Sequence, residues 1–61
     1  MGWIVYLFYN TNKTKILKIM EFNRIKDISY VLGIKPSIIS NFYHKFINPR
    51  GILQYIYIYR V

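Results

Sequence analysis

The chain has 61 residues, no cysteine and nine Lys and Arg against two acids, Glu21 and Asp27, which gives a formal charge of +7. A chain this short forms a single domain with a small core. Because neither a disulfide nor a metal cluster of His and acids is available to it, we expect no metal and no cofactor. No apolar stretch approaches the roughly 20 residues that a membrane-spanning helix needs, and the start of the chain lacks a signal-peptide pattern. We therefore expect an intracellular protein without membrane contact, and its charge favours a polyanion, above all nucleic acid.

Two strands are expected first. Residues 3–9 (WIVYLFY) are β-branched and aromatic, and the turn-forming residues 10–13 (NTNK) end the run. Residues 15–22 show partial alternation of apolar and polar side chains. We predict that these two strands form a β-hairpin.

Residues 25–42 (IKDISYVLGIKPSIISNF) are typical of a helix-turn-helix unit. The first helix is predicted over 24–32, with Asn23 as its cap and Gly33 as the turn residue that tolerates a positive φ. The second is predicted over 36–46, because Pro36 suits the first position of a helix. Ile39 should face the core with Phe42.

The opposite side of the second helix carries small polar residues between lysines, as a DNA-recognition helix requires. Asn suits contact with adenine, whereas Lys and Arg suit phosphate. The DNA-binding residues that we predict are Lys35, Ser37, Ser40, Asn41, His44, Lys45 and Arg50.

A third strand is predicted over residues 52–60, after a turn at 48–51 (NPRG), because its side chains alternate. Leu53 would then share a face with Tyr55, Tyr57 and Tyr59. The expected fold is α+β, in the order ββααβ, with a small three-stranded sheet. Two short helices cover only one face of such a sheet, so we expect a homo-oligomer joined through the other face, whose paired recognition helices would reach two half-sites on DNA.

Several of these segments together are similar to a known family. They are the run at 6–9, the strand at 15–22, Ile25-Lys26-Asp27, Leu32-Gly33-Ile34, Ile38-Ile39-Ser40 and the aromatic strand after Gly51. They resemble the nuclease-associated modular helix-turn-helix domain, which accompanies homing endonucleases in phages and mobile elements and also occurs in stand-alone viral proteins. The chain departs from that family at Ile28-Ser29, where two alanines are frequent. The resemblance implies binding of duplex DNA and a regulatory role in a virus, phage or mobile element.

Alternatives remain at three places. Lys13, Lys15 and Lys18 either form a solvated face or grip a phosphate backbone beside the recognition helix. The tyrosines of the third strand either pack or stack the bases of single-stranded RNA. The apolar strand offers a further function, in which the chain is a small interaction or inhibitor protein that adds to a partner's sheet. With one His and two scattered acids, the chain lacks the paired groups of an enzyme, and we expect none.

Overall fold

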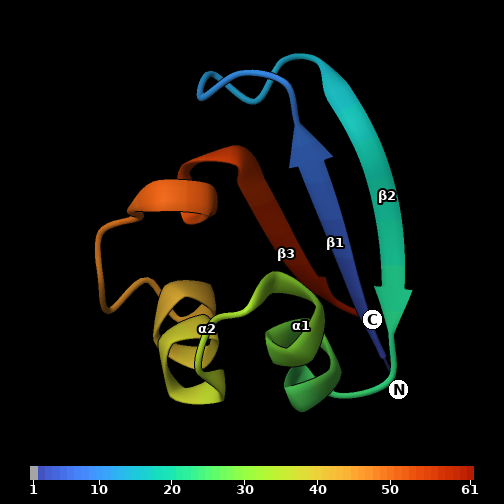
Figure 1. The fold of residues 1–61 in the computed structure, drawn as a ribbon, viewed down its shortest axis with the longest axis vertical. Helices are drawn as coiled ribbons and strands as arrows, with labels where there is room; N and C mark the ends of the chain where they lie inside the picture. The colour runs from blue at the N-terminus through green and yellow to red at the C-terminus, as the bar shows by residue number, and fades with distance from the viewer. Residues whose placement is uncertain (1) are drawn as a thin grey trace.

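The structure, a computed structural model, describes residues 2–61. Its strands are β1 (Trp3–Phe8), β2 (Ile16–Phe22) and β3 (Ile56–Arg60), and its helices are α1 (Ile25–Leu32), α2 (Pro36–Tyr43) and the short 3₁₀ helix η1 (Gly51–Tyr55). The order is ββααβ with η1 before the last strand (Figure 1). The predicted α+β fold is confirmed.

The sheet has the strand order β2-β1-β3, and both pairings are antiparallel. Val5 on the central strand lies opposite Met20 on β2 and Ile58 on β3. The predicted hairpin of the first two strands is therefore present, with an irregularity between Leu7 and Phe8. Since residues opposite each other in an antiparallel pair share a face, this register assigns every strand side chain to one side of the sheet.

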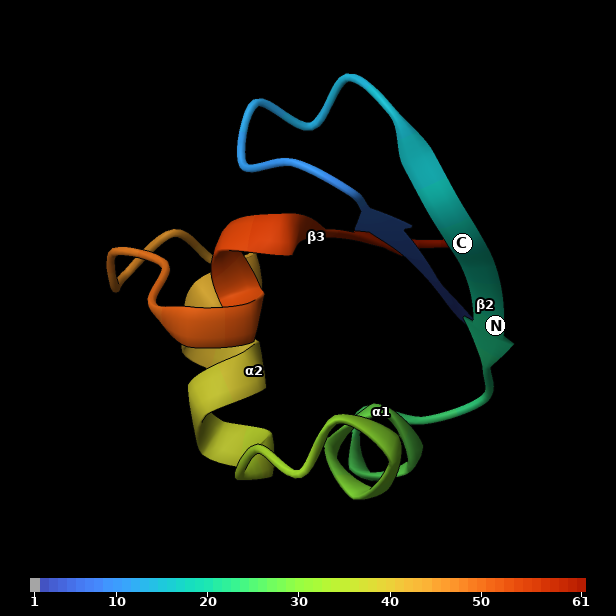
Figure 2. The same ribbon diagram turned by 45° about the horizontal axis from the view of Figure 1, so that its top comes forward.

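Both α-helices and η1 lie against one face of the sheet (Figures 1 and 2). The core between these layers consists of Val5, Ile28, Ile39, Leu53, Ile56 and Ile58. The predicted inward positions of both helices, Ile28 and Ile39, are fully buried. Within residues 2–61, no helix or strand covers the opposite face.

The turn between the helices has the geometry that the sequence indicates. Gly33 has φ 69°, and its N–H donates to the Ser29 carbonyl at 2.8 Å. The N–H of Ile34 donates to the same carbonyl at 3.2 Å, while the Ser29 hydroxyl donates to the Ile34 carbonyl. Ser29 thus closes the turn with its side chain as well as its backbone, and Ile34 packs against the core.

The start of α1 differs from the prediction. Arg24, not Asn23, is the residue at the N-cap, and no side chain caps the helix. The Arg24 carbonyl accepts from the N–H of Asp27 at 3.1 Å, so the first turn begins one residue later than an Asn23 cap requires. The Asp27 carboxylate in that turn lies 3.6 Å from Nε of Arg24 and suits the positive end of the helix dipole.

The end of α2 also differs, because the helix stops at Tyr43 and not at Phe46. Lys45 takes a left-handed conformation with φ 63°. The N–H of Phe46 then donates to the Asn41 carbonyl at 2.8 Å, and that of Lys45 donates to Phe42 at 3.1 Å. This pair of bonds is the Schellman motif, here built on a lysine where glycine is usual.

The predicted strand over 52–60 is wrong in its first half. Residues Gly51–Tyr55 form η1, and only Ile56–Arg60 is extended. The pairing with β1 ends at Leu7 opposite Ile56, so residues before Ile56 have no ladder partner and satisfy backbone groups locally instead. The 3₁₀ turn places Leu53 in the core with Ile56, whereas strict alternation had put Leu53 on the face of Tyr57.

Candidate nucleic-acid interface

One side of α2 is a polar stripe. Ser37, Asn41 and His44 are exposed, and on a helix they lie opposite the buried Ile39. Ser40 lies at the flank of the stripe and is half-buried. The predicted outward face is therefore present, with Ser40 less accessible than the other three.

Cations lie at both ends of this stripe. Lys35 is exposed at the N-cap of α2, and Lys45 is exposed just after its last turn. We call the group Lys35, Ser37, Asn41, His44 and Lys45 the α2 surface.

Arg50 lies beside α2 and not on its polar stripe. It lines a hollow of about 520 Å³ together with Ile34, Ile38, Ile47, Asn48 and Leu53. Ile38 belongs to the flank of α2 opposite Ser40 and is partly exposed next to this hollow. A guanidinium at the rim of an apolar groove can reach a phosphate while Ile38 contacts an apolar edge such as a thymine methyl group.

The hairpin loop brings a further cation to α2. The Lys13 ammonium lies 5.6 Å from the centre of the Phe42 ring, and Lys13 and Lys45 line the same hollow of about 140 Å³. Lys13 has φ 57°, and the loop around it is tied by Asn10, whose side chain bonds both the hydroxyl and the N–H of Thr14. Within residues 2–61, Lys13 and Lys45 are the two residues other than glycine that have a positive φ.

The other two lysines of the hairpin lie elsewhere. The Lys15 ammonium lies 5.2 Å from the centre of the Tyr9 ring, and Lys18 is opposite Leu7 on β2. Of the three hairpin lysines, the structure therefore brings only Lys13 to the α2 surface. Its position beside Phe42 depends on the loop conformation, which no periodicity in the sequence indicates.

The acids lie away from α2. Asp27 pairs with Arg24 at the start of α1, and Glu21 is opposite Ile4 on the uncovered face of the sheet. No acid follows Asp27 in the sequence, so the segment that contains α2 has only positive charges. The field at this surface attracts anions.

Neighbouring aromatic rings restrict the orientation of the His44 side chain. Its imidazole stacks on the Phe46 ring at 5.6 Å between centroids and meets the Tyr43 ring edge-on at 5.0 Å. Tyr43 in turn packs edge-on against Trp3 at 4.9 Å. His44 is therefore held by its neighbours at the C-terminal end of α2, in reach of a ligand at that end of the stripe.

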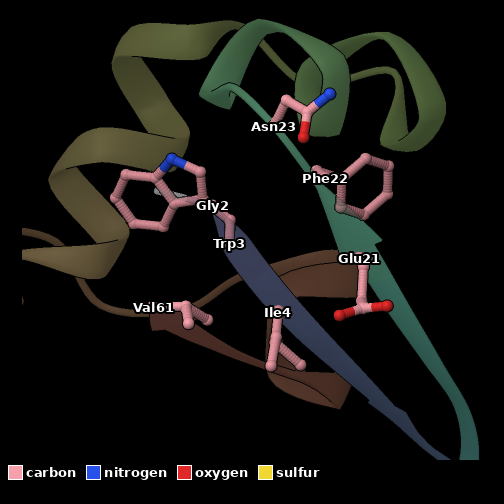
Figure 3. Close-up of a pocket in the computed structure, with 7 residues that line it drawn as sticks. All are labelled: Gly2, Trp3, Ile4, Glu21, Phe22, Asn23 and Val61. Carbon is pink, nitrogen blue, oxygen red and sulfur yellow. The ribbon is translucent and has the colours of Figure 1, made fainter.

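A third hollow, of about 440 Å³, lies at the end of the sheet away from the hairpin loop and is lined by Gly2, Trp3, Ile4, Glu21, Phe22, Asn23 and Val61 (Figure 3). Its side chains do not converge. Trp3 and Phe22 share the helix side of the sheet, whereas Ile4 and Glu21 share the other side. This hollow has no constellation that would hold a ligand.

Neither a metal site nor a membrane span is found in the described part of the chain. Residues 2–61 contain no group of three His, Cys, Asp or Glu side chains near enough to share an ion. None of the helices in the same range is long and apolar enough to cross a bilayer.

Comparison with known proteins finds no family model that matches the chain, no similar curated protein and no similar solved structure. The resemblance to the homing-endonuclease helix-turn-helix domain therefore stays a prediction from the sequence.

Proposed function

We propose that the chain binds duplex DNA by inserting α2 into the major groove, with Asn41 and Ser37 toward the bases. The observation that carries this proposal is the polar stripe of α2, which has a lysine at each end and lies in a segment, residues 28–61, that contains no acid. Asn41 suits bidentate contact with adenine, and Ser37 hydrogen-bonds to either kind of base. A regulatory role in a virus, phage or mobile element follows from the family resemblance.

Phosphate contacts come from the cations that surround the stripe. Lys35 flanks one end of α2, Lys45 and Lys13 flank the other, and Arg50 lies along the side. Such contacts orient the protein on the duplex, while the side chains on the stripe read sequence. His44, held between Tyr43 and Phe46, lies far enough along α2 to meet the backbone.

The experiment that tests this function titrates labelled random-sequence duplex, single-stranded DNA and structured RNA with the protein at several salt concentrations. We expect duplex to bind best, with an affinity that falls steeply as salt rises. Equal affinity for all three probes would refute recognition of duplex DNA by α2. No binding at low salt would favour the second candidate function, an interaction protein that adds β3 to a partner's sheet. That candidate is supported by the position of β3 at the edge of the sheet.

A further inference from the structure

The face of the sheet opposite the helices is apolar and aromatic. Register assigns Ile4 and Tyr6 of β1, Ile19 and Glu21 of β2, and Tyr57 and Tyr59 of β3 to this open face. Ile19 is 55% exposed, Tyr57 45% and Tyr59 41%. Tyr59 contacts the ring of Tyr57 at 4.5 Å and that of Tyr6 at 5.5 Å, so the three rings form one continuous patch.

The open face has no positive charge, although the chain has nine cations. In residues 2–61 no Lys or Arg occupies an open-face position on the strands, because Lys18 lies opposite Leu7 and Arg60 lies over the Trp3 ring on the helix side. A stacking platform for nucleic acid needs cations that follow the phosphate backbone, and this face has an acid instead. Two chains of charge +7 repel each other, and the repulsion is weakest where such a cation-free face meets its copy.

Glu21 supplies the charge complementarity. It lies near the end of β2, is exposed, and forms no ion pair with any of the residues 2–61. Lys15 comes directly before the opposite end of β2, in the hairpin loop, where its ammonium lies over the Tyr9 ring. If two copies face each other across a two-fold axis that runs across the strands, their β2 strands are antiparallel and each Glu21 meets the Lys15 end of the other copy.

The orientation of α2 follows from the same arrangement. Ile39 of α2 packs on the helix side of the sheet, so Asn41 and the rest of the α2 surface are directed away from the open face. Layer spacings of about 10 Å put the two α2 axes of such a pair about 30 Å apart, on opposite outer sides. Both polar stripes then point outward, in opposite directions.

We propose that the open face joins two copies of this chain back to back, and that the dimer holds one DNA duplex on each of its outer sides. The bridging part of this proposal depends on the proposed DNA binding, whereas the dimer does not. It replaces the expectation of two half-sites on one duplex, since two outward surfaces cannot enter the same side of a single double helix. The molecule measures 25 × 22 × 19 Å, so the interface belongs to the small class, and we expect a weak dimer that dissociates at about micromolar concentration.

Sedimentation of the protein without DNA tests the dimer. We expect the wild type to shift from monomer to dimer across micromolar concentrations, and Tyr57→Lys to raise the dissociation constant about tenfold or more. Tyr30→Lys is the matched control, because Tyr30 is 90% exposed on α1 and its substitution leaves the dimer intact. Ile19→Lys on another strand of the open face repeats the test, should Tyr57→Lys fail to fold by circular dichroism.

A charge swap tests the arrangement of the two copies. Glu21→Lys and Lys15→Glu each weaken the dimer about three- to tenfold, and the double variant restores most of the loss. A wild type that stays monomeric at every concentration overturns the proposal, as does a dimer that both open-face lysine variants leave unchanged. A double variant no tighter than the single ones overturns the antiparallel pairing of β2.

Bridging is measured by recovery of a fluorescent duplex on beads that carry a second duplex, each about two helical turns long. We expect recovery with the wild type and Tyr30→Lys, and loss of recovery with Tyr57→Lys even though that variant still binds one duplex. A dimer that binds only one duplex per two chains, and not two, refutes bridging. A dimer that binds no DNA at all leaves self-association standing and refutes the proposed function instead.

Discussion

The α2 surface and the open face of the sheet are both exposed, yet their chemistry is opposite. The α2 surface has short polar side chains between lysines, with Lys13 and Arg50 beside it. The open face has aromatic and aliphatic side chains and, within residues 2–61, no cation on its strands. A chain of only 61 residues thus separates a surface suited to a polyanion from one suited to its own copy.

The separation has a simple physical origin. Two short helices cover one face of a three-stranded sheet. The other face is left with large apolar side chains, because β1 and β3 carry apolar and aromatic residues on both faces. Cations on that face would oppose any contact between copies.

The largest expected effect is on the free energy of unfolding, at Ile39, which supports both α2 and the sheet. Ile39 is fully buried between α2 and the sheet, so Ile39→Ala should lower the free energy of unfolding by about 2–5 kcal/mol, enough to unfold much of a domain this small. Ile38→Ala on the same helix is the control, since Ile38 is 38% exposed and should cost far less. Thermal unfolding followed by circular dichroism measures both, and equal losses would contradict the assigned faces of α2.

The second largest effect is the loss of DNA affinity as the salt concentration rises, which tests the α2 surface separately from the open face. If Lys35 and Lys45, together with Lys13 and Arg50 beside them, neutralise about four phosphates, the slope of log K against log salt should be roughly −4 for duplex DNA. Between 50 mM and 200 mM salt the affinity should then fall by about 10²- to 10³-fold. The dissociation constant of the dimer should change far less over the same range, because most of the groups that the open face buries are apolar. A flat slope for DNA would remove the proposed role of the α2 surface.

Sequence discrimination is the third test. Asn41→Ala should reduce the difference between preferred and random duplexes by about 1–3 kcal/mol, the value of one good base contact, and should not alter the salt slope. The preferred sequence comes first from selection on random duplexes. Should the variant lose the same affinity for every duplex, Asn41 contacts backbone and not base.

The smallest effect is expected at the end of α2, where one residue influences stability and binding in opposite directions. Lys45 has φ 63°, a conformation that costs most residues about 1–2 kcal/mol and glycine little. Lys45→Gly should therefore raise the stability by about 0.5–1 kcal/mol and lower the salt slope for DNA by about one, because one phosphate contact is lost.

Lys35→Gly provides the matched control for that change. Lys35 has φ −57°, so its replacement removes the same charge without relieving a left-handed backbone. Its salt slope should fall equally while its melting temperature does not rise. A Lys45→Gly variant that binds duplex as tightly as the wild type would exclude Lys45 from the phosphate contacts.

One tyrosine of the open face, Tyr59, has a raised pKa. The neighbouring Tyr57, through a side-chain hydrogen bond, raises the pKa of Tyr59 above its ordinary value of 10.0, and partial desolvation adds to this. Tyr59 is consequently neutral throughout the physiological range. Tyr59 therefore adds no negative charge to the open face at physiological pH.

Much of this protein is determined by the sequence alone. Gly33 and Pro36 bound the turn and the start of α2, and the apolar spacing identifies Ile28 and Ile39 as core. The β-branched and aromatic run at 3–9 predicts the first strand, and the partial alternation over 15–22 predicts the second. These predictions succeeded because each depends on neighbours within one or two helical turns. The polar stripe of α2 was identified in the same way.

Only the tertiary structure decided the remainder. Residues 52–55 alternate as a strand does, but β1 offers no partner before Ile56, so they form η1 and Leu53 enters the core. The left-handed Lys45 ends α2 early, and the loop held by Asn10 sets Lys13 beside Phe42, far from it in the sequence. Each outcome depends on which segments meet in space and on how many residues their pairing includes. Local periodicity contains no information about either.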